Sequence, residues 1–275
     1  MLLWGASVFI ATLVPRSLRF NLWSRLQRAR HVLVFCLGVA VLATLPLQAG
    51  IIGDGWADAL RLDVLASVAN QTTIGAAWWC QLAGGIVLLF LSRARAPMAM
   101  RATAAVAGGL LASLAITGHA AMDDGVRGIL HRVNDVMHVW AAGAWMGALP
   151  VVLLLLPGLK APATAAAATQ ALSRFSTAGH AVVAIVMLSG VASMFLILGG
   201  LPADWSYSYQ KLLALKILTV AGMAVLAIVN RYVLVPAMRR GPAAAMYFQR
   251  LTVMEIAMSA MAVFLVAWFG MLEPN

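Results

Sequence analysis

Long apolar runs, separated by short polar stretches, follow one another along the whole chain. A run of about 20 apolar residues in helical conformation crosses the hydrocarbon core of a bilayer, so these runs predict membrane-spanning helices. Composition excludes a soluble domain, because 63% hydrophobic and 10% charged residues leave too little polar surface to face water. We therefore predict an all-α, polytopic membrane protein that forms a single integral membrane helical domain over residues 1–275.

Eight of the runs are candidates for transmembrane helices. They cover residues 1–14, 31–51, 73–91, 101–118, 133–156, 178–199, 212–235 and 251–272. The first run is too short to cross about 30 Å of hydrocarbon at about 1.5 Å per residue. Basic residues follow this run instead of preceding it, which is not the pattern of a signal peptide. We expect the sequence to begin inside a longer first helix, so that any ligand from further upstream is missing.

The positions of the basic residues predict the orientation of the helices. Most Lys and Arg residues fall in every second loop, and such loops are typically cytoplasmic. These residues are Arg16, Arg19, Arg25, Arg28, Arg30, Arg93, Arg95, Arg101, Lys160, Arg174, Arg239, Arg240 and Arg250. Both termini are therefore expected in the periplasm, outside a bacterial inner membrane. The net charge of +10 is spread over these loops and does not form the single patch that binds nucleic acid.

The stretch 131–149, HRVNDVMHVWAAGAWMGAL, brings polar groups onto an apolar helix. Residues three, four and seven apart share one helical face. That face consists of His131, Asp135, His138, Ala142 and Trp145. Polar groups are costly in lipid, so they either pair with one another or with water, or they bind a ligand. The small residues that follow, up to Gly147, allow a neighbouring helix or a flat cofactor to come close.

Three of the five histidines lie near one another in the sequence, at or just below the expected periplasmic face. Imidazole binds copper and zinc, thioether favours Cu(I), and carboxylate suits Cu(II). The candidate metal ligands are His119, His131, His138, Asp135, Met122 and Met137. The sequence thus indicates a copper site open to the periplasm, without a regular motif such as HExxH.

The expected periplasmic loop 53–72 mixes charged and apolar residues. Residues 56–68 are predicted to form a short helix at the membrane interface, with Trp56 as its anchor. This helix is either a lid over an outward-facing site or a passive connector. Cys36 and Cys80 have neither metal-ligand nor disulfide spacing and are expected to be buried small hydrophobes.

The last three runs contain further polar and sulfur-containing side chains. His180 is either part of a proton relay or exit path, or a hydrogen-bonded residue at the interface. Lys216 either extends towards the membrane surface or faces the helix bundle. Arg231 and Glu255 are expected to form an ion pair. One face of the last run is expected to serve as a metal relay or as adaptable packing. It carries Met254, Met258 and Met261.

An ordered set of short motifs extends from residue 118 to residue 238. The motifs are GHA at 118–120, H-x6-W-x-G-x-L at 138–149, LSRFS at 172–176, SG at 189–190, LLALK at 212–216 after Tyr207, and NRYVLVPAM at 230–238. In this order they resemble the CopD family of copper-resistance membrane proteins, and the resemblance covers most of the chain. It implies an inner-membrane protein of eight helices that binds copper, works beside a periplasmic CopC-like copper carrier and moves copper inward.

A more distant resemblance concerns part of the same region. The residues His138, Trp145, Gly147 and Lys216 are similar to a pattern in HemJ-type membrane proteins. That resemblance implies a b-type haem with His138 as an axial ligand and Lys216 as a second candidate. The small residues after His138 would then form the flat slot that a porphyrin needs. The sequence has neither a Walker A nor an aspartyl-phosphate motif, so we expect a copper-handling protein without ATP-driven transport and not an enzyme.

Overall fold

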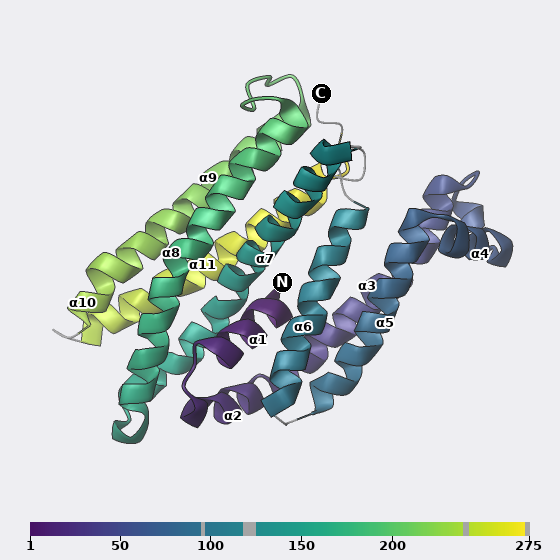
Figure 1. Cartoon of the computed structure of the whole chain (residues 1–275). Coiled ribbons are helices and arrows are strands. Elements are labelled where there is room, and N and C mark those ends of the chain that lie inside the picture. Colours follow the sequence, from purple (N-terminus) through teal and green to yellow (C-terminus); the bar gives the residue numbers. More distant parts are fainter. Residues whose placement is uncertain (95–96, 118–124, 239–241, 273–275) are drawn as a thin grey trace. The chain divides into compact units, whose positions relative to one another are not determined.

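The computed structural model describes residues 1–94, 97–117, 125–238 and 242–272 (Figure 1). All regular elements within these ranges are helices, as the sequence predicts. Seven of the helices so described are long and apolar enough to cross a membrane. They are Gln27–Ile52, Thr73–Arg93, Met98–Ile116, Gly125–Leu159, Pro162–Leu198, Ser208–Ala237 and Ala243–Phe269. The all-helical, multi-pass class is therefore confirmed.

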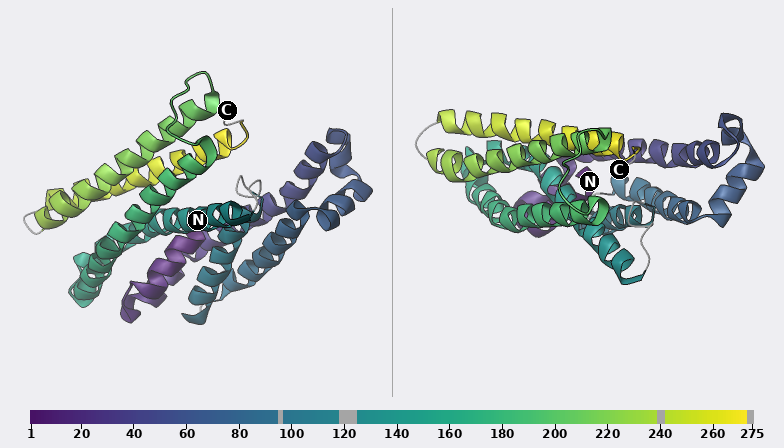
Figure 2. Two further views of the ribbon diagram at one scale, coloured as in Figure 1. Left: turned by 45° about the horizontal axis from the view of Figure 1, so that its top comes forward. Right: turned by 90° about the horizontal axis from the view of Figure 1, so that it is seen from above.

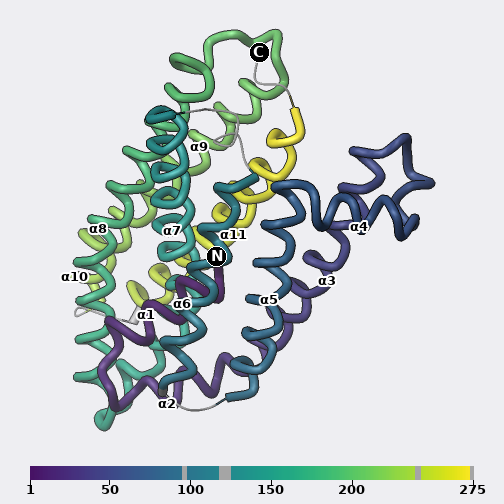
Figure 3. The backbone as a smooth tube through the Cα atoms, turned by 45° about the vertical axis from the view of Figure 1, so that its right-hand side comes forward, coloured from purple at the N-terminus to yellow at the C-terminus, as the bar shows by residue number. Residues whose placement is uncertain are grey.

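The chain divides into two compact units, Met1–Gly147 and Ala148–Asn275. The first unit contains α1 (Leu2–Thr12), α2 (Arg16–Arg25), α3 (Gln27–Ile52), η1 (Trp56–Leu60), α4 (Leu62–Gln71), α5 (Thr73–Arg93), α6 (Pro97–Ser113), η2 (Leu114–Ile116) and most of α7 (Gly125–Leu155). Within it α3 lies beside α5 (Figure 3), α5 packs on α6, and α6 packs on α1. The indole Nε1 of Trp78 on α5 donates a hydrogen bond of 2.8 Å to the Val41 carbonyl oxygen on α3.

The second unit is built around an antiparallel helix pair. It contains η4 (Leu156–Leu159), α8 (Pro162–Leu198), α9 (Ser208–Val229), the π-helical turn η5 (Asn230–Leu234), α10 (Val235–Ala237) and α11 (Pro242–Phe269). Helices α9 and α11 lie side by side in both views of Figure 2. Tyr209 at the beginning of α9 meets Phe269 at the end of α11, with 5.0 Å between ring centroids. An edge-to-face contact of this kind ties the two helix ends together.

The apolar runs identify the spanning helices but place several of their first residues too late. Helix α7 begins at Gly125 instead of residue 133, α8 at Pro162 instead of residue 178, and α11 at Pro242 instead of residue 251. The added segments are rich in alanine or polar residues, which favour helix without being apolar enough to be read as membrane-spanning. Proline at the first position also favours the starts of α8 and α11, because its missing N–H has no helical partner there.

The predicted helix at residues 1–14 is present as α1. Its 11 residues rise about 17 Å, well below the roughly 30 Å of a hydrocarbon core. Helix α1 therefore differs in length from the seven long candidates, although it is equally apolar.

The prediction that Cys36 and Cys80 are buried is wrong, because both are exposed on the surfaces of α3 and α5. Phe35 and Phe90 on the same helices are also strongly exposed, by 70% and 69%. In a bilayer such surfaces face lipid, which accepts small and large apolar side chains as readily as a protein core does.

Candidate metal centre

The candidate metal centre begins in the first half of α7, which is helical from Gly125 to Leu155 as the spacing of its polar residues predicts. His131 is 2% exposed, and its Nε2 lies 3.8 Å from Oδ1 of Asp135, one turn further along. This distance fits an ion pair but is too long for a hydrogen bond. The side chain of Asp135 is 27% exposed, so the carboxylate joins a buried imidazole to a more open surface.

His138 continues the same face and is partly buried. It lies seven residues beyond His131, or about 10 Å along the helix axis, with Asp135 between the two. Asp135 is thus four residues from His131 and three from His138, and both spacings bring side chains together on a helix. Met137 points elsewhere, because one residue turns the helix by about 100°, and its side chain is 46% exposed.

Two candidate ligands, His119 and Met122, lie outside the described residues. Within the described part of the chain, no three His, Cys, Asp or Glu side chains converge closely enough to hold a metal ion. The pair formed by His131 and Asp135 is therefore the part of the predicted site that the structure brings together.

The small residues after His138 receive a neighbouring helix, α1. A Cβ atom added to Gly147 would lie 2.7 Å from the Cα of Gly5, so the two backbones touch. The indole Nε1 of Trp4 on α1 donates a hydrogen bond of 2.9 Å to the carbonyl oxygen of Trp140 on α7. Trp140 in turn donates one of 2.8 Å to the carbonyl oxygen of Gly108 on α6.

This packing bears directly on the haem alternative. The small residues Gly143 and Gly147, which would have lined a flat slot, are in contact with α1 instead. The second candidate axial ligand, Lys216, lies on α9 in the second unit. Its ammonium nitrogen is 5.9 Å from the ring centroid of Phe269, within cation–π range. Nothing in these contacts favours haem.

Polar side chains in the second unit pair differently from the prediction. The amide Nδ2 of Asn230 donates a hydrogen bond of 2.6 Å to Glu255, which is 3% exposed. Arg231, the expected partner of Glu255, donates instead to the hydroxyl of Ser176. His180 shares a hydrogen bond of 2.9 Å with the hydroxyl of Tyr232, which confirms its interpretation as a hydrogen-bonded residue.

The methionine face of α11 is only partly internal. Met258 packs on α9, where a Cβ atom added to Gly222 would come within 2.7 Å of its methyl carbon. Met254 and Met261 are about half exposed. Adaptable packing accounts for Met258. The three methionines do not form a continuous internal path for a metal ion, because two of them are exposed.

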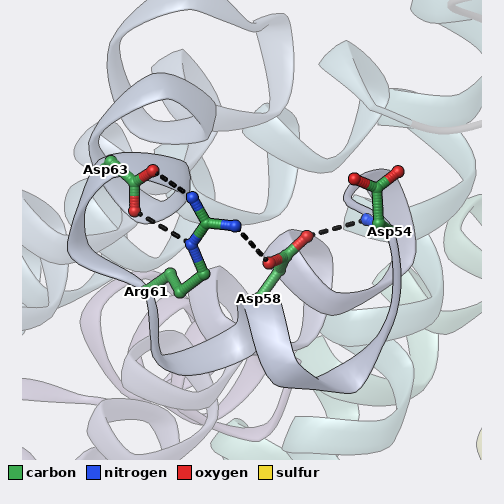
Figure 4. A network of polar contacts seen from close by, with 4 residues as sticks. All are labelled: Asp54, Asp58, Arg61 and Asp63. Carbon is green, nitrogen blue, oxygen red and sulfur yellow. Dashed lines mark hydrogen bonds and ion pairs between the residues drawn. The ribbon is translucent and has the colours of Figure 1, made fainter.

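The loop between α3 and α5 contains a network that the sequence analysis missed (Figure 4). Asp58 is 6% exposed and accepts hydrogen bonds from the backbone N–H of Asp54, at 2.8 Å, and from Nη1 of Arg61, at 3.1 Å. Arg61 also donates to Asp63 at 2.6 Å. This hydrogen bond lowers the pKa of Asp63 and raises that of Arg61. The grouping of three aspartates and one arginine within ten positions is the signal that points to such a network.

The predicted short helix at residues 56–68 has two parts in the structure. Trp56–Leu60 forms a 3₁₀ turn, and α4 follows at Leu62–Gln71. Trp56 is 68% exposed and Leu62 is 82% exposed. Exposed apolar residues beside a charged network are typical of a segment at a membrane interface.

Comparison with known proteins gives consistent results for both halves of the chain. Residues 1–129 match the family model of the copper resistance protein D-like N-terminal domain, and residues 169–269 match that of copper resistance protein D. The chain is 34% identical over 276 residues to inner membrane protein YebZ of Escherichia coli (strain K12), covering 100% of this chain and 94% of the relative.

Two further relatives carry copper in their names. The chain is 34% identical over 220 residues to copper resistance protein D of Pseudomonas syringae pv. tomato, with 76% of this chain and 71% of the relative covered. It is 29% identical over 203 residues to copper transport protein CutJ of Bacillus subtilis (strain 168), with 69% of this chain and 37% of the relative covered. No solved structure matches the chain.

Proposed function

Because this chain belongs to the copper resistance protein D family of inner membrane proteins, we propose that it binds copper at the periplasmic end of α7 and moves the ion inward. The observation that carries the proposal is the pairing of a buried imidazole, His131, with the carboxylate of Asp135. A buried polar ring beside a carboxylate is costly unless both groups have a task.

The proposed roles follow from the chemistry of each side chain. His131 and His138 serve as imidazole ligands, for which copper has high affinity. Asp135 lies beside the His131 ring and orients it, as carboxylates beside metal-binding histidines do. His119 and Met122 complete the ligand set from the segment that precedes α7, where the thioether of Met122 favours Cu(I).

The direction of transport depends on topology, for which we propose eight membrane helices with both termini in the periplasm. The concentration of arginine in alternate loops supports this orientation. Helix α1 is the eighth helix in this arrangement, and its close packing on α7 supports its place within the bundle. The end of α7 that carries His131 then faces the periplasm.

A periplasmic, CopC-like copper carrier is the proposed donor of the ion. Four aspartates, Asp54, Asp58, Asp63 and Asp204, lie in loops on the proposed periplasmic side. Acidic loops around an outward-facing site attract cations and basic surfaces, which supports delivery on this side. Asp58 and Asp63 are engaged with Arg61 in the loop network, and Asp204 accepts hydrogen bonds from the backbone N–H and the hydroxyl of Ser206.

Copper binding by the purified full-length protein tests the proposal. The substitutions His131→Ala and His138→Ala should each lower the amount of copper retained after dialysis, measured by elemental analysis. His180→Ala is the matched control, because it removes an imidazole that is hydrogen-bonded to Tyr232 in the second unit. Lys216→Met should also leave copper unchanged, since a protonated ammonium offers no lone pair. Equal loss of copper from His180→Ala would place the site elsewhere and refute the assignment to α7.

A further inference from the structure

The segment formed by α2 and the first turn of α3, residues 16–30, is the most basic part of the first unit. Arg16, Arg19, Arg25, Arg28 and Arg30 fall within 15 residues, and no Asp or Glu occurs before Asp54. We call α2 and the first turn of α3 the α2–α3 elbow. It lies at one end of a membrane-spanning helix. A polybasic stretch at such a position attracts anionic lipid.

Two side chains, Arg30 and Trp23, form the interior of the elbow. They are 4% and 1% exposed. The guanidinium carbon of Arg30 lies 3.7 Å from the centroid of the Trp23 ring, a close cation–π contact. Nη2 of Arg30 donates a hydrogen bond of 3.3 Å to the backbone carbonyl oxygen of Trp23. The cation is thus held in place by one aromatic face and one weak hydrogen bond.

Three N–H groups of this pair have no hydrogen-bond partner, namely Nε1 of Trp23 and both Nε and Nη1 of Arg30. Buried donors without partners cost free energy, and the cost is larger when the group is charged. All three groups are donors and one of the side chains is a permanent cation. The complementary group is therefore an anion with several acceptor oxygens, and a phosphate fits this description.

We propose that the α2–α3 elbow binds the phosphate of an anionic phospholipid headgroup through Arg30 and Trp23. The elbow lies where a spanning helix leaves the hydrocarbon, which is the level of the lipid phosphates. Indole N–H groups and arginine head groups are both favoured at this level. The long arginine side chain can leave the face of Trp23 and extend towards the interface without movement of the helix. The surrounding arginines supply the longer-range attraction.

Thermal unfolding of the purified full chain in neutral detergent tests this site with defined additions. Phosphatidylglycerol should raise the midpoint temperature, whereas phosphatidylcholine and inorganic phosphate should leave it almost unchanged. Arg30→Gln and Trp23→Phe should each lose most of the lipid-induced shift. Arg28→Gln should keep it, because Arg28 is an exposed arginine two residues away and its loss changes the net charge equally. Each shift is taken relative to the same variant without lipid, so a lower starting stability does not affect the comparison.

A second measurement covers variants that do not fold well. Native mass spectrometry of the wild type and of Arg30→Lys, which keeps the charge but loses the planar donor fork, should show phosphatidylglycerol retained by the first and released by the second. Equal loss of lipid from Arg28→Gln and Arg30→Gln would show that the lipid is attracted by the overall positive charge alone, and this result would overturn the site. An equal shift from inorganic phosphate would overturn the lipid as the source of the anion, and no shift from phosphatidylglycerol would overturn the proposal altogether.

Discussion

Replacing Gly147 by alanine should weaken the attachment of α1 to α7. The added Cβ would lie 2.7 Å from the Cα of Gly5, 2.8 Å from the nitrogen of Ala6 and 2.8 Å from the carbonyl oxygen of Leu2. All three atoms belong to the backbone of α1, so no side-chain rotation relieves the overlap. Carbon atoms in favourable contact are about 3.5–4.0 Å apart, and α1 must therefore move by roughly 1 Å.

The expected loss of stability follows from two opposing effects. Overpacking a close contact costs about 1–3 kcal/mol. Alanine gains about 0.5–1 kcal/mol over glycine inside a helix, because it has less backbone freedom to lose. The net destabilisation is thus between about 0 and 2.5 kcal/mol, with a centre of about 1 kcal/mol, which corresponds to a fall of a few degrees in the midpoint of thermal unfolding for a chain of this size.

Thermal unfolding in detergent, followed by circular dichroism, measures this change. Gly109→Ala is the matched control, since Gly109 is also inside a helix and an added Cβ there meets nothing within 4 Å. The control should unfold at the wild-type temperature or slightly above it. If Gly147→Ala and Gly109→Ala unfold at the same temperature, the close packing of α1 on α7 is refuted.

Two further predictions concern topology and the polar contact in the second unit. Reporter fusions after Arg28 should report the cytoplasm and fusions after Asp58 the periplasm; the reverse result for either would contradict the proposed orientation. Asn230→Leu removes a hydrogen bond to a buried carboxylate and should cost about 1.5–3 kcal/mol in a thermal or denaturant assay. Thr219→Val, which removes only an exposed hydroxyl bonded within its own helix, should cost much less, and equal losses would show that the Asn230 contact contributes little.

The sequence predicts those features that depend on local pattern. Apolar runs of membrane-spanning length give the class and the identity of the long helices. The four-residue spacing of His131 and Asp135 gives their contact, because that spacing places both on one face of any α-helix. Helix starts such as Pro162 are less predictable, since a helix continues beyond the hydrocarbon wherever its residues favour helical structure.

Contacts between distant segments are not contained in such patterns. The small residues near Gly147 indicate a close approach, but only the fold shows that α1 is the approaching partner. The partner of Glu255 was misassigned by one residue, to Arg231 instead of Asn230. Arg231 and Glu255 were paired because both lie near the same end of their helices, and that proximity does not distinguish Arg231 from the adjacent Asn230.

The proposed metal site and the contact with α1 lie on different faces of α7. At about 100° per residue, the face of His131, Asp135 and His138 lies roughly 130° from the face through Gly143 and Gly147 that receives α1. Substitutions on the two faces should then have separable effects. Asp135→Asn should weaken copper binding with little change in the unfolding temperature, because this carboxylate is partly exposed and acts through the orientation of an imidazole. Gly147→Ala should lower the unfolding temperature while copper affinity, measured by competition with a chelator well below that temperature, stays near the wild-type value. Loss of affinity in both variants to the same degree would mean that the two faces are coupled and would contradict this division of roles.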